Sequence, residues 1–415
     1  LQFKLKFQRQ TLQHNHFVTQ SLLSVCFDLK SMVYSSSLLT CFLLLAVVNG
    51  KPIVPALFIF GDSIGDAGNN NQLLTLVKSN FPPYGRDFKN HIPTGRFCNG
   101  KLATDFIAEK LGFTSPQPAY FNLEAKGNNL LNGANFASAA SGFYDLVPML
   151  YNTIPLYKQM EYYEECQSIL VEIVGQSKAS SIISNAIYLI IDGSSDFINY
   201  YTNILVHNGH TFEQFSDIVL QSYSKYIQHI YALGARRIGV TNLAPTGCLP
   251  IVITLFGSHR NECVDWLNKD AIYYNKRLNY TSEKLQKLLP DLNLVVFDIY
   301  QPLYNLITKP SENGTKSNYP SVPILLFLMN LGFVIVYLFL ICGMHSTAIT
   351  GFLETRRGCC GTGLIELSIL CNEKSIGTCV NASEYVFWDT VHPTEAANQI
   401  LADQMIAAGI SQLTS

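Results

Sequence analysis

Short apolar runs alternate with longer amphipathic stretches along most of this chain. The apolar runs predict buried strands within residues 57–61, 131–142, 186–191, 237–241 and 292–298. The amphipathic stretches predict helices over residues 101–111, 155–174, 211–233, 265–289 and 393–408. Strands that alternate with helices of these lengths indicate a parallel sheet with helices on both faces. The pattern therefore predicts an α/β fold with a doubly wound parallel sheet.

The first apolar run ends in a small, polar turn that contains Ser63. Gly61 and Gly65 allow a sharp turn that presents backbone N–H groups beside the hydroxyl. Open α/β sheets bind their ligands at the carboxyl ends of the strands, so Ser63 is a candidate nucleophile. Gly-Asp-Ser is a common tripeptide, however, and a turn with an N-capping serine is the alternative interpretation. Partner residues elsewhere in the chain must distinguish the two.

Asp389 and His392 are the candidate partners of this serine. A serine hydroxyl becomes a good nucleophile when a base takes its proton and a third group orients that base. Pro393 suits the first turn of a helix, so both side chains are expected in the loop that enters the last helix. A solvated histidine at a helix cap is the alternative interpretation of His392.

The chain resembles the GDSL esterase/lipase family of the SGNH hydrolases, in its plant secreted branch. Two motifs together carry the resemblance, Gly61-Asp62-Ser63 and Asp389-x-x-His392-Pro393. The resemblance implies a flavodoxin-like sheet of the SGNH-hydrolase type. It also implies an enzyme that cleaves carboxylic esters or lipids through an acyl-enzyme and needs no cofactor. Ser63 is then the nucleophile, His392 the general base and later the general acid, and Asp389 the group that orients His392.

The resemblance also implies three donors for the oxyanion of the reaction. They are the N–H of Ser63, a glycine N–H from a second block, and an asparagine side chain from a third block. Gly142 is the expected glycine, with Gly133 as an alternative. The third block carries Ser195 where asparagine is usual, and its hydroxyl is a shorter donor. The alternative function is therefore a catalytically weak or inactive secreted or membrane-tethered binding protein of the same fold.

Composition and charge narrow the functional classes. With 415 residues, 48% of them hydrophobic, the chain can bury a large core. A net charge of −2 gives no electrostatic reason to expect nucleic acid as a partner, and the expected partner is a small-molecule ester or lipid. The sequence has no Walker motif and no His-Glu-x-x-His motif, so neither a nucleotide nor a metal is expected.

Cysteines and glycosylation sequons favour an oxidising compartment. Of the 11 cysteines, an even set of eight lies in the predicted domain and is expected to form disulfides whose pairing the sequence leaves open. These are Cys98, Cys166, Cys248, Cys263, Cys359, Cys360, Cys371 and Cys379. Acceptor sequons stand at Asn279, Asn313 and Asn381. The expected location is extracellular, in the cell wall space.

One catalytic domain is expected, preceded by two short segments. Residues 32–50 have a short apolar core followed by small residues, which is typical of a secretory signal peptide. Residues 1–31 show no sustained periodicity and are expected to lie outside the mature protein. The hydrolase domain is predicted to comprise residues 51–314 and 352–415.

Residues 315–351 interrupt the predicted domain. They contain the uncharged apolar stretch 324–342, which is long enough to span a membrane. A single span at this position would put Ser63 and His392 on opposite sides of the membrane, where they could not form a hydrogen bond. A translated retained intron is therefore the preferred interpretation, and a membrane segment is the alternative.

Overall fold

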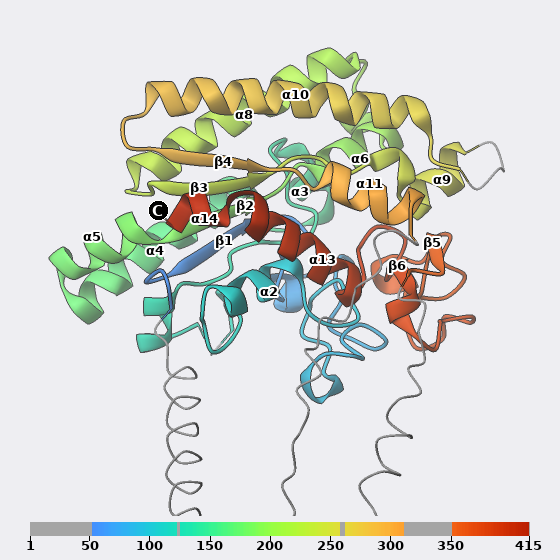
Figure 1. The fold of residues 1–415 in the computed structure, drawn as a ribbon, viewed down its shortest axis with the longest axis horizontal. Helices are drawn as coiled ribbons and strands as arrows, with labels where there is room; N and C mark the ends of the chain where they lie inside the picture. Colours follow the sequence, from blue (N-terminus) through green and yellow to red (C-terminus); the bar gives the residue numbers. More distant parts are fainter. Residues whose placement is uncertain (1–51, 123–124, 258–261, 311–350, 415) are drawn as a thin grey trace, which may run out of the picture. The chain divides into compact units, whose positions relative to one another are not determined.

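Four parallel strands form the central sheet, in the spatial order β1-β2-β3-β4. They are β1 Leu57–Gly61, β2 Ile187–Ile191, β3 Arg237–Thr241 and β4 Asn293–Phe297 (Figure 1). The computed structural model describes residues 52–122, 125–257, 262–310 and 351–414. In-register pairing aligns the carboxyl ends of the strands at one edge, with Gly61 opposite Ile191 and Thr241 opposite Phe297.

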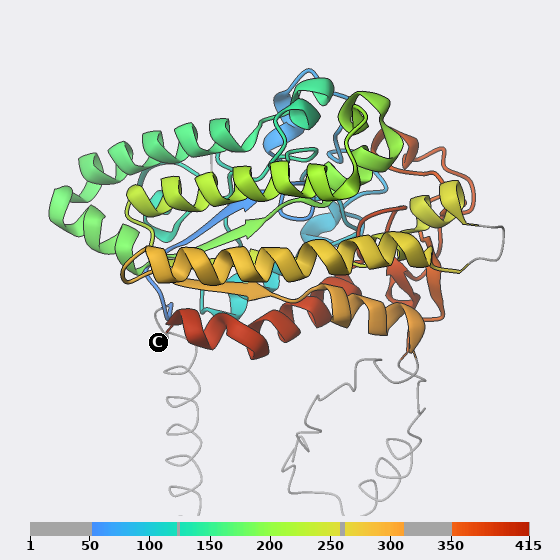
Figure 2. The ribbon, with the colours of Figure 1, turned by 90° about the horizontal axis from the view of Figure 1, so that it is seen from above.

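Helices cover both faces of this sheet. The α-helices are α2 Ala103–Lys110, α3 Leu146–Tyr151, α4 Leu156–Val174, α5 Gln176–Asn185, α6 Ser194–Thr202, α7 Ile204–His207, α8 Phe212–Ala232, α9 Pro250–Phe256, α10 Asp265–Leu288, α11 Tyr300–Thr308, α13 Glu395–Met405 and α14 Ser411–Thr414. Helices α4, α5, α8 and α10 lie over one face, and α2, α13 and α14 lie over the other (Figures 1 and 2). Their buried side chains form a separate core cluster on each face. The predicted doubly wound α/β fold is thus confirmed.

Alternate residues of β1 point to opposite faces of the sheet and join different parts of the core. Leu57 and Ile59 pack with residues of α2 and α13, whereas Phe58 and Phe60 pack with residues of α4 and α8. All four side chains are buried. The continuous apolar run that predicted this strand is therefore explained by helices on both of its faces.

The strand predicted within residues 131–142 was wrong, because this segment forms only isolated bridges beside β1. Ile59 donates its N–H to the carbonyl of Ala134 and accepts the N–H of Phe136, at 3.1 and 2.7 Å. Asn135 is bridged to Ile59 and to Ala119. Gly133 and Ala140 have positive φ values of 100° and 63°, so the backbone turns away before a longer ladder can form.

The last long helix begins at Glu395, two residues later than the sequence predicted. Thr394 is the N-cap, and its hydroxyl accepts the N–H of Ala397 at 3.3 Å. Pro393 lies outside the helix and is bridged to Phe387. The hydroxyl of Thr394 satisfies a free amide of the first turn, which explains why the helix starts there. Other short helical turns are Asn69–Gln72, Lys89–His91, Gly127–Asn132, Thr246–Cys248, Ser368–Leu370, Ala382–Glu384 and Ile406–Ile410.

A two-stranded parallel sheet of β5 Glu354–Gly358 and β6 Tyr385–Phe387 precedes the Asp389 loop. Two disulfides, Cys359–Cys379 and Cys360–Cys371, close the segment between these strands. A third disulfide joins Cys248 to Cys263. The disulfides therefore restrain the chain on the approach to the Asp389 loop.

The expectation that all eight cysteines pair was wrong for two of them. Cys98 and Cys166 are free thiols, and both are buried. Cys166 lies on α4 in the core beside the sheet, and Cys98 lies in the loop before α2, where its sulfur accepts from Gly100 and Asn398. The two thiols thus lie in different parts of the fold, on α4 and in the loop before α2, and an even number of cysteines did not make them partners.

Several predictions concern residues outside the described part of the chain. These are the segments 1–31, 32–50 and 315–351, with the apolar stretch 324–342, and the sequon at Asn313. Among the helices that the structure does describe, none combines the length and the apolar character that crossing a bilayer requires.

Candidate active site

Ser63 lies in a tight turn at the carboxyl end of β1. Gly61 has φ 131°, and a Cβ at this position would meet the Ile191 carbonyl oxygen at 1.8 Å. The carbonyl of Asp62 accepts the N–H groups of Gly65 and Asp66, at 3.1 and 3.0 Å. Only glycine fits where the backbone of Gly61 lies so close to Ile191 of β2. The chain can therefore turn sharply here and place Ser63 at the edge of the sheet.

The structure brings Ser63, His392 and Asp389 together, although Ser63 and His392 are 329 residues apart. His392 Nε2 lies 2.7 Å from Ser63 Oγ. His392 Nδ1 lies 2.9 and 2.8 Å from the two carboxylate oxygens of Asp389. Asp389 and His392 are buried, whereas Ser63 is partly exposed. This is the geometry of a nucleophile, a base and a group that orients the base.

The Asp389 carboxylate is held by two backbone amides and by a tyrosine that the sequence did not indicate. Its Oδ1 accepts the N–H groups of Val391 and His392, at 2.9 and 2.8 Å. Its Oδ2 accepts the hydroxyl of Tyr84 at 2.8 Å. Because 305 residues separate Tyr84 from Asp389, no local pattern could have paired them.

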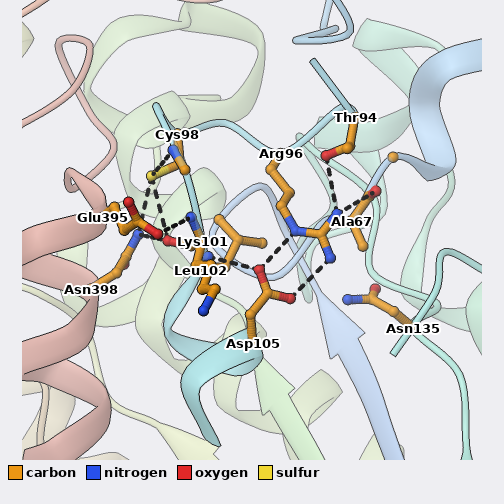
Figure 3. Close-up of polar contacts among 12 residues, drawn as sticks. Ala67, Thr94, Arg96, Cys98, Lys101, Leu102, Asp105, Asn135, Glu395 and Asn398 are labelled. Atoms are coloured by element: carbon orange, nitrogen blue, oxygen red, sulfur yellow. Dashed lines mark hydrogen bonds and ion pairs between the residues drawn. The ribbon is translucent and has the colours of Figure 1, made fainter. Parts of the chain in front are cut away.

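The loop of residues 96–102 is fastened to α2 on one side and to α13 on the other (Figure 3). Arg96 and Asp105 form a buried, two-pronged ion pair with N–O distances of 2.7 and 2.9 Å. Glu395 accepts the N–H of Lys101 at 3.2 Å, and Asn398 donates to the Lys101 carbonyl at 3.2 Å. These contacts fix the loop from both ends.

Phe97 is carried by this loop and packs on the histidine. Its ring centroid lies 4.9 Å from that of His392, with an angle of 38° between the rings. The side chain is buried at 2% exposure. Phe97 therefore limits rotation of the imidazole and shields it from water on one side.

Gly142, the expected oxyanion donor, lies in a turn that is attached to the Ser63 turn. Ser138 donates its N–H to the Gly61 carbonyl at 2.9 Å. Gln159 binds both backbone groups of Gly61 at 3.0 Å and also donates to Ser141 Oγ at 3.0 Å. The alternative, Gly133, lies against Leu57 at the opposite end of β1.

Ser195 occupies the first turn of α6, directly after the carboxyl end of β2. It is partly exposed, and its carbonyl accepts the side-chain amide of Asn199 at 2.9 Å. Among the contacts of the described residues, none joins Ser195 to Ser63 or His392. The structure thus places Ser195 at the same edge of the sheet as the serine turn, without a direct contact to Ser63 or His392.

Several buried aspartates lie around the carboxyl ends of β1 and β2, among them Asp62, Asp192 and Asp196. Burial raises the pKa of Asp62 to about 6. Burial, and then the charges of Asp62 and Asp196, raise the pKa of Asp192 well above its usual range. Burial also raises the pKa of Asp196, although the N–H groups of Phe143 and Tyr144 oppose the change. Within the described ranges, no group of three His, Cys, Asp or Glu side chains is arranged to hold a metal ion.

Two of the three predicted sequons lie in the described part of the chain. Asn279 is exposed on α10. Asn381 is exposed at the start of a short helical turn, where its side-chain oxygen accepts the N–H of Ser383 at 3.1 Å. Both side chains are therefore accessible to a modifying enzyme.

Comparison with known proteins identifies the class. The family model of the GDSL-like lipase/acylhydrolases matches residues 57–405, and the chain belongs to this family. A GDSL esterase/lipase of Arabidopsis thaliana is 54% identical over 89% of this chain and 93% of its own length. The GDSL esterase/lipase APG of the same plant is 51% identical over 87% of this chain and 92% of its own length.

Proposed function

We propose that the protein is a serine hydrolase that cleaves carboxylic esters or lipids through an acyl-enzyme. The observation that carries the proposal is the contact of His392 Nε2 with Ser63 Oγ at 2.7 Å, with Asp389 on the other side of the ring. Membership of the GDSL-like lipase/acylhydrolase family supports an ester-hydrolysing enzyme. No step of this reaction requires a cofactor.

In the proposed reaction, Ser63 Oγ attacks the ester carbonyl while His392 Nε2 accepts its proton. Asp389 keeps the proton of His392 on Nδ1 and stabilises the positive ring that forms. His392 then gives the proton to the leaving alcohol, and Ser63 holds the acyl group. Water attacks this acyl-enzyme by the same steps in reverse order, and the carboxylic acid leaves.

The negative charge on the carbonyl oxygen needs donors that are already in place. We assign this role to the N–H of Ser63, the N–H of Gly142 and the hydroxyl of Ser195. The serine hydroxyl is shorter than an asparagine amide and rotates more freely, so its contribution is smaller. A weaker third donor lowers turnover but leaves the mechanism intact.

The same family membership supports the proposed substrate class and location. The substrate is a small-molecule ester or lipid. The proposed mature enzyme comprises residues 51–314 and 352–415, is secreted after removal of residues 32–50, and carries glycans at Asn279, Asn313 and Asn381. The three disulfides support an oxidising compartment. Residues 315–351 are proposed to be foreign to the domain, and membrane association through 324–342 is the alternative.

Covalent labelling of the purified protein by a fluorophosphonate tests this function. The probe forms a stable bond only with a serine that is activated by a neighbouring base. Labelling is expected in the wild type and should vanish in Ser63→Ala. Ser168→Ala, which removes an exposed serine hydroxyl on α4, is the matched control and should label normally. A folded wild-type protein that does not label would instead support the binding protein without catalysis.

A further inference from the structure

The Asp389 carboxylate has a side-chain partner besides His392. Tyr84 Oη donates to Asp389 Oδ2 at 2.8 Å, and the two residues are 1% and 0% exposed. The direction of this bond is fixed because a carboxylate oxygen only accepts. The oxygen of Tyr84 in turn accepts the N–H of Ser368 at 2.9 Å, which holds the hydroxyl in place.

The two carboxylate oxygens of Asp389 accept hydrogen bonds from different donors. Oδ1 receives two backbone amides, from Val391 and His392, which belong to the same short loop. His392 Nδ1 lies close to both oxygens, and Tyr84 is the one further donor to Oδ2 among the residues that the structure describes. The tyrosine is therefore the donor that fixes the carboxylate from outside its own loop, and it determines how Oδ2 faces Nδ1.

The ring of Tyr84 also supports His392, through Phe97. It packs edge-on against Phe97, with a distance of 5.8 Å between the ring centroids. Phe97 in turn lies 4.9 Å from the ring of His392. A single buried side chain thus touches Asp389 directly and supports the aromatic contact of His392.

Tyr84 also links the site to the disulfide-closed segment. Ser368, whose N–H binds Tyr84, lies between Cys360 and Cys371. The hydroxyl of Ser368 accepts the N–H of Lys78 at 2.9 Å and is within reach of two nearby carbonyls. Three distant parts of the chain therefore meet at one phenol oxygen.

From these contacts we infer that Tyr84 is a positioning residue for the reaction, which acts by orienting the Asp389 carboxylate toward His392. The inference rests on the serine hydrolase function proposed above. Burial, and then the charge of Asp389, raise the pKa of Tyr84 well above its usual value. The hydroxyl therefore keeps its proton and remains a donor at neutral pH.

The test is Tyr84→Phe, which removes one oxygen and keeps the ring. Hydrogen bonds to charged groups contribute about 1.5–3 kcal/mol, so kcat for a short-chain nitrophenyl ester should fall about tenfold or more. The rate of fluorophosphonate labelling should fall in parallel. KM should stay within about twofold, because the tyrosine does not touch the substrate. Rates are taken per folded molecule, as judged by circular dichroism.

Tyr188→Phe is the matched control. This tyrosine is also fully buried, donates to the Ile183 carbonyl at 2.8 Å, and shares a hydrogen bond with Tyr163 at 2.7 Å. It lies near the amino end of β2, away from the edge that carries Ser63. Its loss should lower the melting temperature but leave kcat unchanged. An equal loss of kcat in both variants would mean a general packing effect and would overturn the inference.

A double-mutant cycle with Asp389→Ala tests whether Tyr84 acts through the carboxylate. In that background there is no carboxylate to orient, so Tyr84→Phe should have little further effect on the residual rate. Additive losses, or an unchanged kcat in Tyr84→Phe alone, would overturn the inference. Either outcome is distinct from failure of the proposed function, which would appear as a folded wild type that does not label, or as labelling that survives in Ser63→Ala.

Discussion

The backbone of Gly142 lies directly against the carboxylate of Asp196. A Cβ at Gly142 would meet Asp196 Oδ1 at 2.1 Å. The same carboxylate accepts the N–H groups of Phe143 and Tyr144, at 2.8 and 3.1 Å. The start of α6 therefore holds the turn that contains Gly142, and this explains why the position has no room for a side chain.

Gly142→Ala should damage the reaction more than the fold. The added methyl group must displace the turn or Asp196, and a small displacement near the reacting atoms can lower kcat by about 10²-fold. Overpacking of this kind costs about 1–3 kcal/mol of stability. Ester hydrolysis and urea unfolding measure the two effects. Gly127→Ala, where a Cβ would meet nothing within 4 Å but the backbone has φ 57°, should lose some stability and keep the wild-type kcat. Normal turnover in Gly142→Ala would exclude Gly142 from the oxyanion site.

Asp62→Asn should change the pH dependence of stability. Burial raises the pKa of Asp62 to about 6 from an ordinary value of 3.8, so the folded state binds this proton more tightly than the unfolded state. Stability therefore falls as the pH rises from about 4 to about 6. The neutral amide should raise the free energy of unfolding at pH 7.5 by on the order of 2 kcal/mol, with a smaller gain near pH 4.

Urea unfolding at these two pH values measures the effect. The asparagine can keep the acceptor for the N–H of Ile64, which lies 3.0 Å from Asp62 Oδ1. Asp291→Asn removes an exposed carboxylate and is the control, with little change expected at either pH. A gain in Asp62→Asn that is the same at pH 4 and pH 7.5 would contradict the argument from burial.

Asp105→Asn tests the support of the loop that carries Phe97. Removal of one partner from a buried ion pair leaves an uncompensated charge and costs about 3–5 kcal/mol. Because Arg96 then loses its anchor, kcat should fall as well. Asp403→Asn breaks the exposed ion pair between Lys110 of α2 and Asp403 of α13, at 3.6 Å. This control should cost less than about 1 kcal/mol. Similar losses in both variants would show that burial of the Arg96 pair is unimportant.

The sequence predicted the sheet and the long helices well, because their signals are local. β2 is an uninterrupted apolar run. α8 is preceded by its N-cap Thr211, which forms a capping box with Gln214 in the structure. The strand predicted within 131–142 was wrong because apolar and small residues there serve turns rather than a ladder. Local composition does not distinguish these two uses.

The candidate site could be predicted only where a motif marks it. Ser63, Asp389 and His392 stand in recognisable short motifs, and the structure places them in contact. Tyr84 and Phe97 carry no such mark, since a buried aromatic residue beside prolines or glycines is common in any core. Their importance arises from contacts between segments hundreds of residues apart, which only the folded chain reveals.

Deletion of residues 315–351 tests the predicted domain limits. The stretch 324–342 has 19 uncharged residues, mostly apolar, and exposure of so large an apolar surface favours aggregation or membrane association. The shortened chain should be soluble, secreted and active, whereas the full chain should be poorly soluble and weakly active. Expression of both chains in a secretory host, with assays of soluble yield and esterase activity, measures this. Equal solubility and activity would show that the segment belongs to the fold.

The most direct test of the account is the identification of the acyl-enzyme. The protein is mixed with a short-chain nitrophenyl ester, quenched in acid within the first turnover, digested, and analysed by mass spectrometry. We expect an acyl group on the peptide that contains Ser63, and no such group in Ser63→Ala. An acyl group on another residue, or release of product without any covalent species under conditions that trap it, would contradict the account.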